Sequence, residues 1–587
     1  MLRLKVHNRT YTQFDWFNET GEIVNGSNLN PLDLNLFTDD LVDATGKLLT
    51  SYYRTSVSIP GILVLCESTY GRDEKNRLLY KCIPDNIGLP YFLVPYMGDL
   101  TNKLSKKKVN KYIVFCLDYW DGKHPRGSVV NTLGEVDNLP AFYDYQIYCK
   151  KLNHSLQTFN TLASRKIIPY RDTTDTDTRL ITEIMQIHGT KIENRVRKNI
   201  FSIDPIGSKD FDDAIGIVNY DKCNIISIYI ANVAILIDFL ELWSAFTERV
   251  STVYLPDKKR SMLPALLSDE LCSLQKDKLR FAFSLDLTVR NAQITNLNYS
   301  CCLVKVAKNY VYEETALLNN TDYLQLLQLT KELHKNKHYV DDIKDSHDLI
   351  EFYMILMNHE CSKNMVENKN GIYRTFINAN KANANKANAN KANANKANAN
   401  KANANKANAN KEEIVIPKDV KQFIAGWEGS SGQYKSYANR TGHELIGVAS
   451  YIHITSPIRR LVDLINSIEL QNNLKLMTFS NKANVFCKGW MEKIDIINEQ
   501  TRSIKTTQNS CNILTMVTSP TFKYENKVEG YLIDQTQKMY MVYIPSLNIV
   551  SKVLINIDLP LYCMRQFTVH LFKDEANFKK KIRLQLV

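Results

Sequence analysis

The chain has 587 residues, which is too many for a single hydrophobic core, and three or four domains are expected. Hydrophobic residues make up 44% of it and charged residues 23%, as in a soluble globular protein, and the longest apolar run, 225–237, is too short to span a bilayer. The net charge of +12 favours a polyanionic partner, but seven of the lysines lie in one low-complexity repeat or directly after it (381–411), and without them the net charge is +5.

The cysteines and the N-terminus indicate an intracellular protein. The twelve cysteines include no CxxC pair and no regular spacing, which is typical of reduced thiols and not of a zinc site or a disulfide framework. The first residues lack the long apolar core of a signal peptide. The choice between nucleus and cytoplasm stays open.

Short strands and turns dominate the first quarter of the chain. Residues 1–55 hold an early aromatic cluster followed by Asn- and Gly-rich turns, which predicts a small β-barrel. Residues 56–145 contain strand-like runs at 59–65 and 112–117, with aromatic residues and five lysines before the second run, as in a barrel that binds single-stranded nucleic acid. The alternative, in which the aromatic residues are core and the lysines only solubilise the surface, stays open.

The rest of the chain is predicted to hold a connector (146–198), one large α/β domain (199–512) and a final region rich in strands (513–587). The elements expected there are, in chain order, a helix over 179–188, a strand over 225–230, helices over 235–250 and 346–366, and strands over 527–531 and 539–544.

A regular five-residue repeat, Lys-Ala-Asn-Ala-Asn, fills residues 378–410. A period of five matches neither helix nor strand, and the segment has no apolar side chain larger than alanine, so it cannot bury enough surface to fold. We therefore predict a disordered insertion in a surface loop of the large domain. Its spaced lysines are compatible with a loose contact to RNA, but passive low-complexity expansion is the preferred explanation.

Four aspartates lie within ten residues of one another between two apolar runs. They are Asp204, Asp210, Asp212 and Asp213. The apolar runs predict two buried strands, and Pro205 and Gly207 predict a tight turn between them. Four anions so close repel one another unless they stay solvated or hold cations. The stretch therefore indicates either a magnesium site or a solvated acidic loop, while its spacing is a poor fit to a calcium EF-hand.

Residues 451–460 form the second informative stretch. Ser456 is a good helix N-cap and the proline after it suits the first helical position, so a helix is predicted to begin there. Arg459 and Arg460 then lie at the positive end of the helix dipole, which favours an arriving phosphate. The alternative is an internal ion pair of Arg459 with Asp463. With the acidic turn, this stretch suggests metal-assisted attack on a phosphodiester, in which arginine neutralises charge in the transition state.

These two stretches closely resemble the signatures of the RNase II (RNB) family of exoribonucleases. Shorter matches are Val253-Tyr-Leu-Pro256, Met262-Leu-Pro264, Leu267-Ser268, Leu271-Cys-Ser-Leu274 and the helix around Met357-Asn358, and residues 114–135 look like the second cold-shock barrel of the exosome-type branch. The resemblance implies a multidomain α+β fold with cold-shock (OB-type) barrels at 1–55 and 56–145, an α/β RNB catalytic domain at 199–512 and an S1-like (OB-type) barrel at 513–587. It leaves no room for the PIN endonuclease domain of that branch, so no endonuclease activity is expected.

The resemblance also implies roles for single residues. The four aspartates, Asp204, Asp210, Asp212 and Asp213, match the family's Mg²⁺-associated positions, where Mn²⁺ is expected to substitute, and Asp212 matches the position most needed for chemistry. Tyr254 matches the aromatic residue that stacks on the 3′-terminal base. Arg459 matches the residue that holds the scissile phosphate, and Arg460 beside it is also expected to bind RNA. The implied reaction is hydrolytic, processive 3′→5′ degradation of single-stranded RNA to nucleoside 5′-monophosphates with two Mg²⁺ ions, by a monomer whose partner in any RNA-decay complex is unidentified.

Some positions depart from the family pattern. They are Asn232 in place of an aspartate, Tyr229 and Asn466 in place of histidines, Leu461 in place of a tyrosine, and Asn370, near Tyr373, in place of a second stacking aromatic residue. These departures bear on the RNA clamp, processivity and product length. Two other functions, a catalytically idle RNA-binding scaffold and a single-strand DNase, fit the same fold. Four mutually repelling acids beside a phosphate-binding arginine favour the active nuclease.

Overall fold

The structure is a computed structural model in two compact units. It describes all residues except 25–28, 98–107, 172–175, 377–416, 418–419, 421–422, 424–431, 520–521, 523–526, 537, 548 and 575–578. The first unit comprises 1–153, 255–258 and 503–587, and the second comprises 154–254 and 259–502. Most of the expected connector therefore belongs to the second unit. The repeat at 378–410 and the lysines at 103, 106 and 107 lie outside the described residues.

An open four-stranded sheet begins the first unit. Its order is β2-β1-β3-β4, and its strands are β1 (Leu2–Val6), β2 (Phe14–Phe17), β3 (Leu41–Val42) and β4 (Leu48–Thr50). Alternation along the strands buries Leu4, Val6 and Trp16 on one face. The barrel expected over 1–55 is thus an open sheet in the structure, and its identity as a cold-shock domain stays a prediction.

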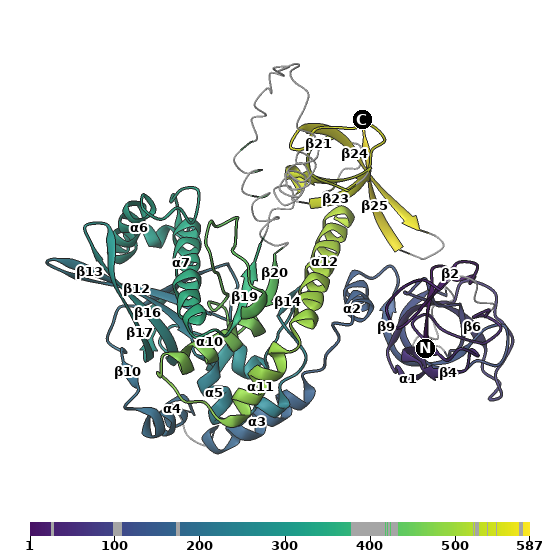
Figure 1. Ribbon diagram of the computed structural model, residues 1–587, viewed down its shortest axis with the longest axis horizontal. Helices are drawn as coiled ribbons and strands as arrows, with labels where there is room; N and C mark the ends of the chain where they lie inside the picture. The colour runs from purple at the N-terminus through teal and green to yellow at the C-terminus, as the bar shows by residue number, and fades with distance from the viewer. Residues whose placement is uncertain are drawn as a thin grey trace, which may run out of the picture. The chain divides into compact units, whose positions relative to one another are not determined.

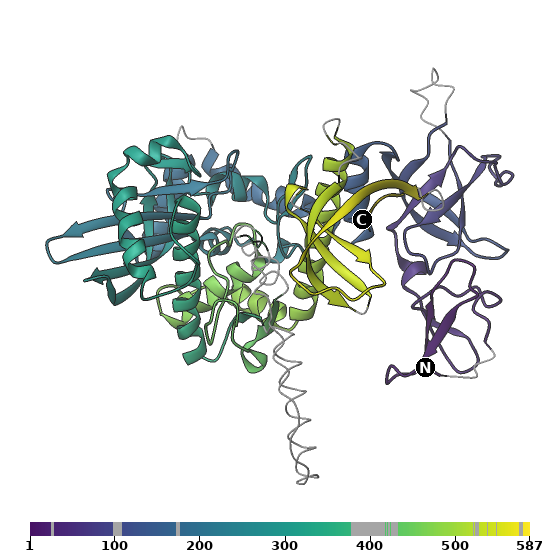
Figure 2. The same cartoon turned by 90° about the horizontal axis from the view of Figure 1, so that it is seen from above.

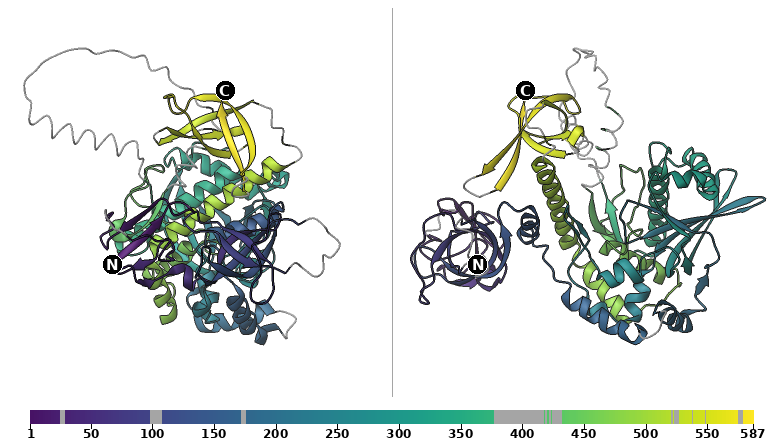
Figure 3. Two further views of the ribbon diagram at one scale, coloured as in Figure 1. Left: turned by 90° about the vertical axis from the view of Figure 1, so that its right-hand side faces the viewer. Right: turned by 180° about the vertical axis from the view of Figure 1, so that it is seen from behind.

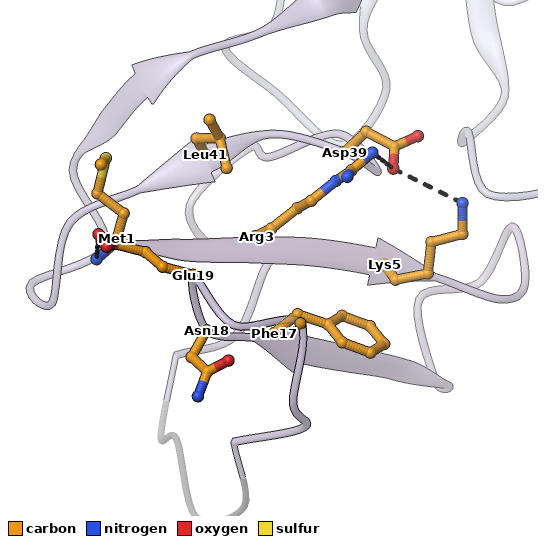
Figure 4. A pocket seen from close by; sticks show the side chains of 9 residues that line it. Met1, Arg3, Lys5, Phe17, Asn18, Glu19, Asp39 and Leu41 are labelled. Carbon is orange, nitrogen blue, oxygen red and sulfur yellow. Dashed lines mark hydrogen bonds and ion pairs between the residues drawn. The ribbon is translucent and has the colours of Figure 1, made fainter. Parts of the chain in front are cut away.

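The opposite face of this sheet lines an open cavity of about 660 Å³. Figure 4 shows Arg3 and Lys5 of β1 pointing toward Asp39, with which they form ion pairs of 3.0 and 3.6 Å. Phe17 of the neighbouring strand β2 also lines the cavity. The two cations in the cavity are therefore already neutralised in part by one carboxylate of the same chain.

Residues 59–135 close into a five-stranded barrel of order β5-β6-β7-β9-β8. Its strands are β5 (Ile59–Val64), β6 (Leu79–Pro84), β7 (Phe92–Pro95), β8 (Lys111–Tyr119) and β9 (Arg126–Glu135), and short helices α1 (Tyr52–Thr55) and α2 (Leu139–Cys149) flank it in sequence. Strands β5 and β8 confirm the two strands predicted there. Phe92 and Trp120 are buried in a core shared with the N-terminal sheet, whereas Lys81 lies 4.5 Å above the ring of Tyr91. The core interpretation therefore holds for Phe92 and Trp120, while binding of single-stranded nucleic acid by this barrel stays a prediction.

The C-terminal part of the first unit is a five-stranded antiparallel sheet after the long helix α12 (Ile494–Thr518). The strand order is β23-β22-β21-β24-β25, with β21 (Lys527–Thr536), β22 (Met539–Ile544), β23 (Ile549–Leu554), β24 (Met564–Asp574) and β25 (Lys579–Leu586). The sheet curls until its edge strands β23 and β25 contact each other (Figure 3). Strands β21 and β22 confirm the predicted strands, and Gly530 is required because a Cβ there would lie 2.7 Å from Val542.

A seven-stranded sheet of order β10-β17-β16-β13-β12-β11-β18 organises the second unit. Its strands are β10 (Ile192–Asn194), β11 (Phe201–Asp204), β12 (Asp213–Tyr220), β13 (Cys223–Ala231), β16 (Leu279–Arg290), β17 (Gln293–Lys305) and β18 (Lys308–Val311). The hairpins β12–β13 and β16–β17 lie side by side (Figure 2). Helices α6 (Thr321–His334) and α7 (Ser346–Glu367) cover one face of the sheet (Figure 1), where Ile228 and Leu285 join Leu326 and Phe352 in one core.

The remaining elements of the second unit support the site described below. They are α3 (Gln157–Arg171), α4 (Thr176–His188), α5 (Val233–Phe239), the hairpin β14 (Val253–Tyr254) and β15 (Lys259–Arg260), the pair β19 (Ile372–Thr375) and β20 (Gln433–Ser436), α10 (Leu461–Asn473) and α11 (Asn481–Met491). The helices predicted at 179–188 and 346–366 and the strand at 225–230 are confirmed. The helix predicted over 235–250 is wrong in length, because Glu241 adopts a left-handed backbone with φ of 54° and ends α5 near Phe239.

Four of the positions that depart from the family pattern, Tyr229, Asn232, Leu461 and Asn466, are buried, and Asn370 is partly buried. Asn232 is buried and donates to the side chain of Gln471 on α10 at 2.7 Å. Asn370 donates to Glu469 at 2.7 Å, and the buried Tyr373 donates to the carbonyl of Asn370. Asparagine at 370 therefore serves a hydrogen-bond network, and Tyr373 presents no exposed ring for stacking. Across the described part of the chain, no helix has the length and apolar character needed to cross a membrane.

Candidate active site

The acidic stretch forms the predicted turn between two buried strands. Asp204 ends β11 and Asp213 begins β12, and the two strands pair through Phe201 and Ile215. Between them, the amide of Ser208 donates to the carbonyl of Pro205 at 3.2 Å, and Gly207 has φ of 81°. This left-handed backbone favours glycine, so the turn depends on Gly207.

A second segment fixes the far side of the turn. The hydroxyl of Ser273 donates to the carbonyl of Lys209 at 2.7 Å and accepts from the amide of Phe211 at 3.0 Å. The amide of Leu274 donates to the carbonyl of Phe211 at 3.0 Å. Asp210 and Asp212 flank Phe211, so the bonds from Ser273 and Leu274 fix the backbone from which both carboxylates project.

The arginine stretch is a turn and not the start of a helix. Helix α10 begins at Leu461, and Arg460 before it is extended, so the predicted helix start at Ser456 is wrong. The cause is pairing with another segment, because the carbonyl of Arg459 accepts from the amide of Thr252 at 2.9 Å and the amide of Leu461 donates to Val250 at 2.9 Å. These bonds hold residues 459–461 against 250–252, and the helix forms only beyond them.

The anion bound by this turn is a side chain of the protein itself, Asp212. Its Oδ1 accepts from the amide of Ile458 at 2.8 Å, and its Oδ2 accepts from Nε of Arg459 at 3.2 Å. The carboxylate is only 3% exposed. Burial raises the pKa of Asp212 to about 7, although Arg459 and the Ile458 amide both favour the charged form.

The two arginines divide between two carboxylates. Arg460 binds the fully buried Asp463 at 2.8 Å, so the ion pair considered for Arg459 belongs instead to Arg460. Arg459 keeps 44% of its side chain exposed, and its Nη2 donates to the hydroxyl of Ser456 at 3.0 Å. Of the two arginines, Arg459 is the one that both contacts the aspartate cluster and is substantially exposed, while an RNA contact of Arg460 stays a prediction.

Asp204 and Asp213 are held without an ion pair to any described basic side chain, and their surroundings disfavour the charged form of both. Burial raises the pKa of Asp204 to about 6, opposed by a hydrogen bond with Ser202. Burial, and then repulsion from Asp204 and Asp212, raises the pKa of Asp213. Oδ2 of Asp204 is buried without a hydrogen-bond partner. A buried acceptor of this kind is costly unless a proton or a cation fills the place.

Asp210 is held by a hairpin. Tyr254 and Lys259 are paired across β14 and β15, and both reach Asp210, at 3.3 Å from the tyrosine hydroxyl and 2.8 Å from Nζ of the lysine. Tyr254 is 40% exposed. The predicted stacking residue thus lies directly beside the predicted metal ligands.

Divalent-cation binding fits two of the four carboxylates best. Asp204 and Asp213 are hard oxygen donors, as Mg²⁺ prefers, and Mg²⁺ often takes only one or two carboxylates plus water and substrate phosphate. Among the described residues, no three side chains of metal-binding type converge closely enough to hold an ion by themselves. The residues therefore fit a cation whose remaining ligands come from water and substrate.

Lys259, Asp269 and Tyr312 also belong to this neighbourhood and were not predicted. Lys259 also binds Asp269, at 2.9 Å. The amide of Tyr312 donates to the carbonyl of Asp204, and burial followed by the charges of Asp213 and Asp204 raises its pKa. Only Lys259 had a usable signal, since the Pro256 turn places it opposite Tyr254 in a short hairpin.

Comparison with known proteins finds relatives in both sequence and fold. Residues 193–338 and 318–476 match the RNB domain family. Ribonuclease R of Helicobacter pylori (strain J99) is 28% identical over 329 residues, which cover 48% of this chain and 49% of that protein. The chain thus spans about half the length of that relative, and 21% of the exosome complex exonucleases RRP44 that it also matches.

Two solved structures share the fold. RNase R of Mycoplasma genitalium, in its apo form, superposes with a TM-score of 0.66 at 16% identity over 100% of both chains. Yeast Ssd1, described as a pseudonuclease, superposes with a TM-score of 0.56 at 13% identity over 91% of this chain and 69% of that chain. The region that matches the RNB domain family contains β11, β12 and the turn between them, which together carry all four aspartates, and it also contains the helix that follows Arg459.

Proposed function

We propose that this protein is a Mg²⁺-dependent 3′→5′ exoribonuclease that hydrolyses single-stranded RNA processively to nucleoside 5′-monophosphates. The observation that carries the proposal is that Arg459 and the Ile458 amide each donate a hydrogen bond to Asp212. This carboxylate lies beside two others, Asp204 and Asp213, that have no described cation of the protein as a partner. The support from Asp204 is that its buried Oδ2, which has no hydrogen-bond partner among the described residues, lies next to a second buried carboxylate, and a cation would satisfy both.

Each side chain has a distinct task in the proposed reaction. Asp204 and Asp213 would hold Mg²⁺, which at such sites stabilises phosphate charge and activates water. The family resemblance implies two such ions. Arg459, fixed through Asp212 and Ser456, directs its exposed guanidinium toward the phosphate and neutralises charge that develops there.

We propose that the 3′-terminal base of the RNA binds at Tyr254. Its half-exposed ring lies one hydrogen bond from Asp210, so a terminal base stacked on it would place the last phosphodiester near the carboxylates. Stacking accepts any base, which supports degradation without strict sequence preference. Solved structures of the M. genitalium relative include complexes with single-stranded and double-stranded RNA, which supports RNA as the polymer.

A catalytically idle RNA-binding scaffold is the second candidate. Its support is the likeness to Ssd1 and the absence, among described side chains, of three metal-binding groups that converge. The active enzyme is preferred because all four aspartates and Arg459 remain at the turn.

The two candidates give different results with 5′-labelled RNA. With Mg²⁺, the labelled single strand is expected to shorten from its 3′ end into a ladder, and the DNA of the same sequence is expected to stay intact. Chelation of the metal should stop the reaction. RNA that binds but never shortens would identify the idle scaffold, and shortening of the DNA would identify a DNase.

Asp212→Asn is expected to reduce cleavage at least a thousandfold while RNA binding changes less than threefold, because the neutral amide loses the charge that orients Arg459. Filter binding and single-turnover cleavage measure the two effects. Asp221→Asn, at the exposed tip of the β12–β13 hairpin, is the matched control and should match wild type. Equal loss of binding and cleavage in Asp212→Asn would instead show a structural role.

Arg459→Ala is expected to slow cleavage by 10²- to 10³-fold, as loss of a transition-state donor does. The neighbouring Arg460→Ala should act mainly on stability, because it leaves the buried Asp463 without its partner. Thermal melting and single-turnover rates separate the two variants. A rate loss of the same size in stably folded Arg460→Ala would show that Arg460 contacts RNA, as the sequence predicted.

The metal-free protein is expected to lose stability as pH rises from about 4 to about 7. The pKa values of Asp204 and Asp212 are raised in the folded state, so it binds more protons than the unfolded chain in that window, and stability falls with rising pH. Melting with a chelator at pH 5 and pH 8 should show a drop of a few degrees. Asp204→Asn should reduce the drop, and Mg²⁺ should reverse it in wild type alone. A melting temperature that rises with pH would contradict the assignment.

A further inference from the structure

Lys259 sits between two carboxylates at the edge of the site. Its Nζ lies 2.8 Å from Oδ1 of Asp210 and 2.9 Å from Oδ1 of Asp269. The side chain is mostly buried, so both carboxylates lie against the ammonium group with little water between them. Lys259 therefore supplies a cation to the aspartate cluster from the protein itself.

The four aspartates consequently fall into two pairs. Asp212 has Arg459 and Asp210 has Lys259 as a cation of the protein itself. Neither Asp204 nor Asp213 forms an ion pair with any described basic side chain, and an oxygen of Asp204 is left without a partner. The place at Asp210 that a second divalent cation would need is thus already filled by an ammonium group.

Asp269 gives Lys259 a second partner, so that the lysine can leave Asp210 and return to it. Oδ1 of Asp269 also accepts from the hydroxyl of Ser268 at 2.6 Å, so this carboxylate is held in place independently of Lys259. If Nζ left Asp210, it would keep the ion pair with Asp269 and would need no fully solvated position. Loss of one of two partners is a much smaller penalty than leaving a half-buried charge unpaired.

We propose that Lys259 is the resident counter-ion of Asp210, so that the free protein takes up one divalent cation, at Asp204 and Asp213, and a second reaches Asp210 only by displacing Lys259 toward Asp269. The inference rests on the proposed metal-dependent function and adds a positioning residue to it. Because Tyr254 holds the other oxygen of Asp210, release of Lys259 is coupled to the residue proposed to receive the RNA end.

Mn²⁺ titration of the full chain without RNA tests the proposal, with free Mn²⁺ counted by electron paramagnetic resonance. Wild type should bind one equivalent, followed by a second at least tenfold more weakly. Lys259→Met should tighten the second equivalent about tenfold and leave the first unchanged. Lys259→Arg should behave like wild type. Lys166→Met, which removes the lysine of an exposed pair with Glu241, is the matched control and should also match wild type.

Asp269→Asn separates a counter-ion from a simple structural tether. Without Asp269, Lys259 has only Asp210 to bind, so the second Mn²⁺ should bind more weakly than in wild type, the opposite of Lys259→Met. A tether would make both variants change in the same direction, and that result would overturn the proposal. Thermal melting of each variant confirms that the comparison is made on folded protein.

The outcomes also separate this inference from the proposed function. If wild type shortens RNA with Mg²⁺ but the titrations of wild type and Lys259→Met superimpose, only the role of Lys259 is wrong. If wild type binds no Mn²⁺ and Asp204→Asn changes nothing, the metal-dependent function itself fails.

Discussion

The two hydrogen bonds that Asp212 accepts from Ile458 and Arg459 are the interactions on which the rest of the site depends. They join the acidic turn to a segment 246 positions further along the chain, through one backbone amide and one guanidinium. The same segment pairs with residues 250–252, which lead directly into the hairpin of Tyr254 and Lys259. Three distant stretches thus meet at the acidic turn, and the same chain of contacts positions the proposed phosphate-binding, base-stacking and metal-binding groups.

Crowded carboxylates make this site a source of instability that the surrounding fold must offset. Asp204, Asp212 and Asp213 are each more costly to ionise here than in water. The packed core of α6 and α7 on the seven-stranded sheet supplies the compensation. Such a balance is typical of functional sites, where groups are arranged for chemistry at the expense of stability.

Local patterns allowed much of the fold and the composition of the site to be predicted. The turn between Asp204 and Asp213 was recognisable because a proline, a glycine and four acids within ten residues are strong local signals, and the helix α7 was recognisable by its apolar spacing. The start of α10 was not, because hydrogen bonds from residues 250–252 override the N-cap preference of Ser456. The length of α5 was missed because the left-handed residue Glu241 has no distinctive local signal.

In the site, too, local sequence patterns predicted which residues are present but not which of them contact one another. The identity of the four aspartates and of Arg459 was accessible from sequence, but their pairing was not. Which arginine binds Asp463, and which aspartate receives Lys259, depends on contacts between segments that no short pattern encodes. Asn232 and Asn370 likewise departed from the family pattern for reasons visible only in the hydrogen bonds they form.

The pairing of β19 with β20 has a consequence for how this sequence tolerates change. Thr375 and Gln433 are direct partners across the two strands, so the chain leaves and re-enters the domain at adjacent points. The repeat lies between these two residues in the sequence, but the four residue pairs of the ladder depend only on β19 and β20. The number of repeat units therefore does not enter the register of the two strands, and this point of the sequence can lengthen or shorten without shifting the pairs that hold Tyr373 and Arg374 in place.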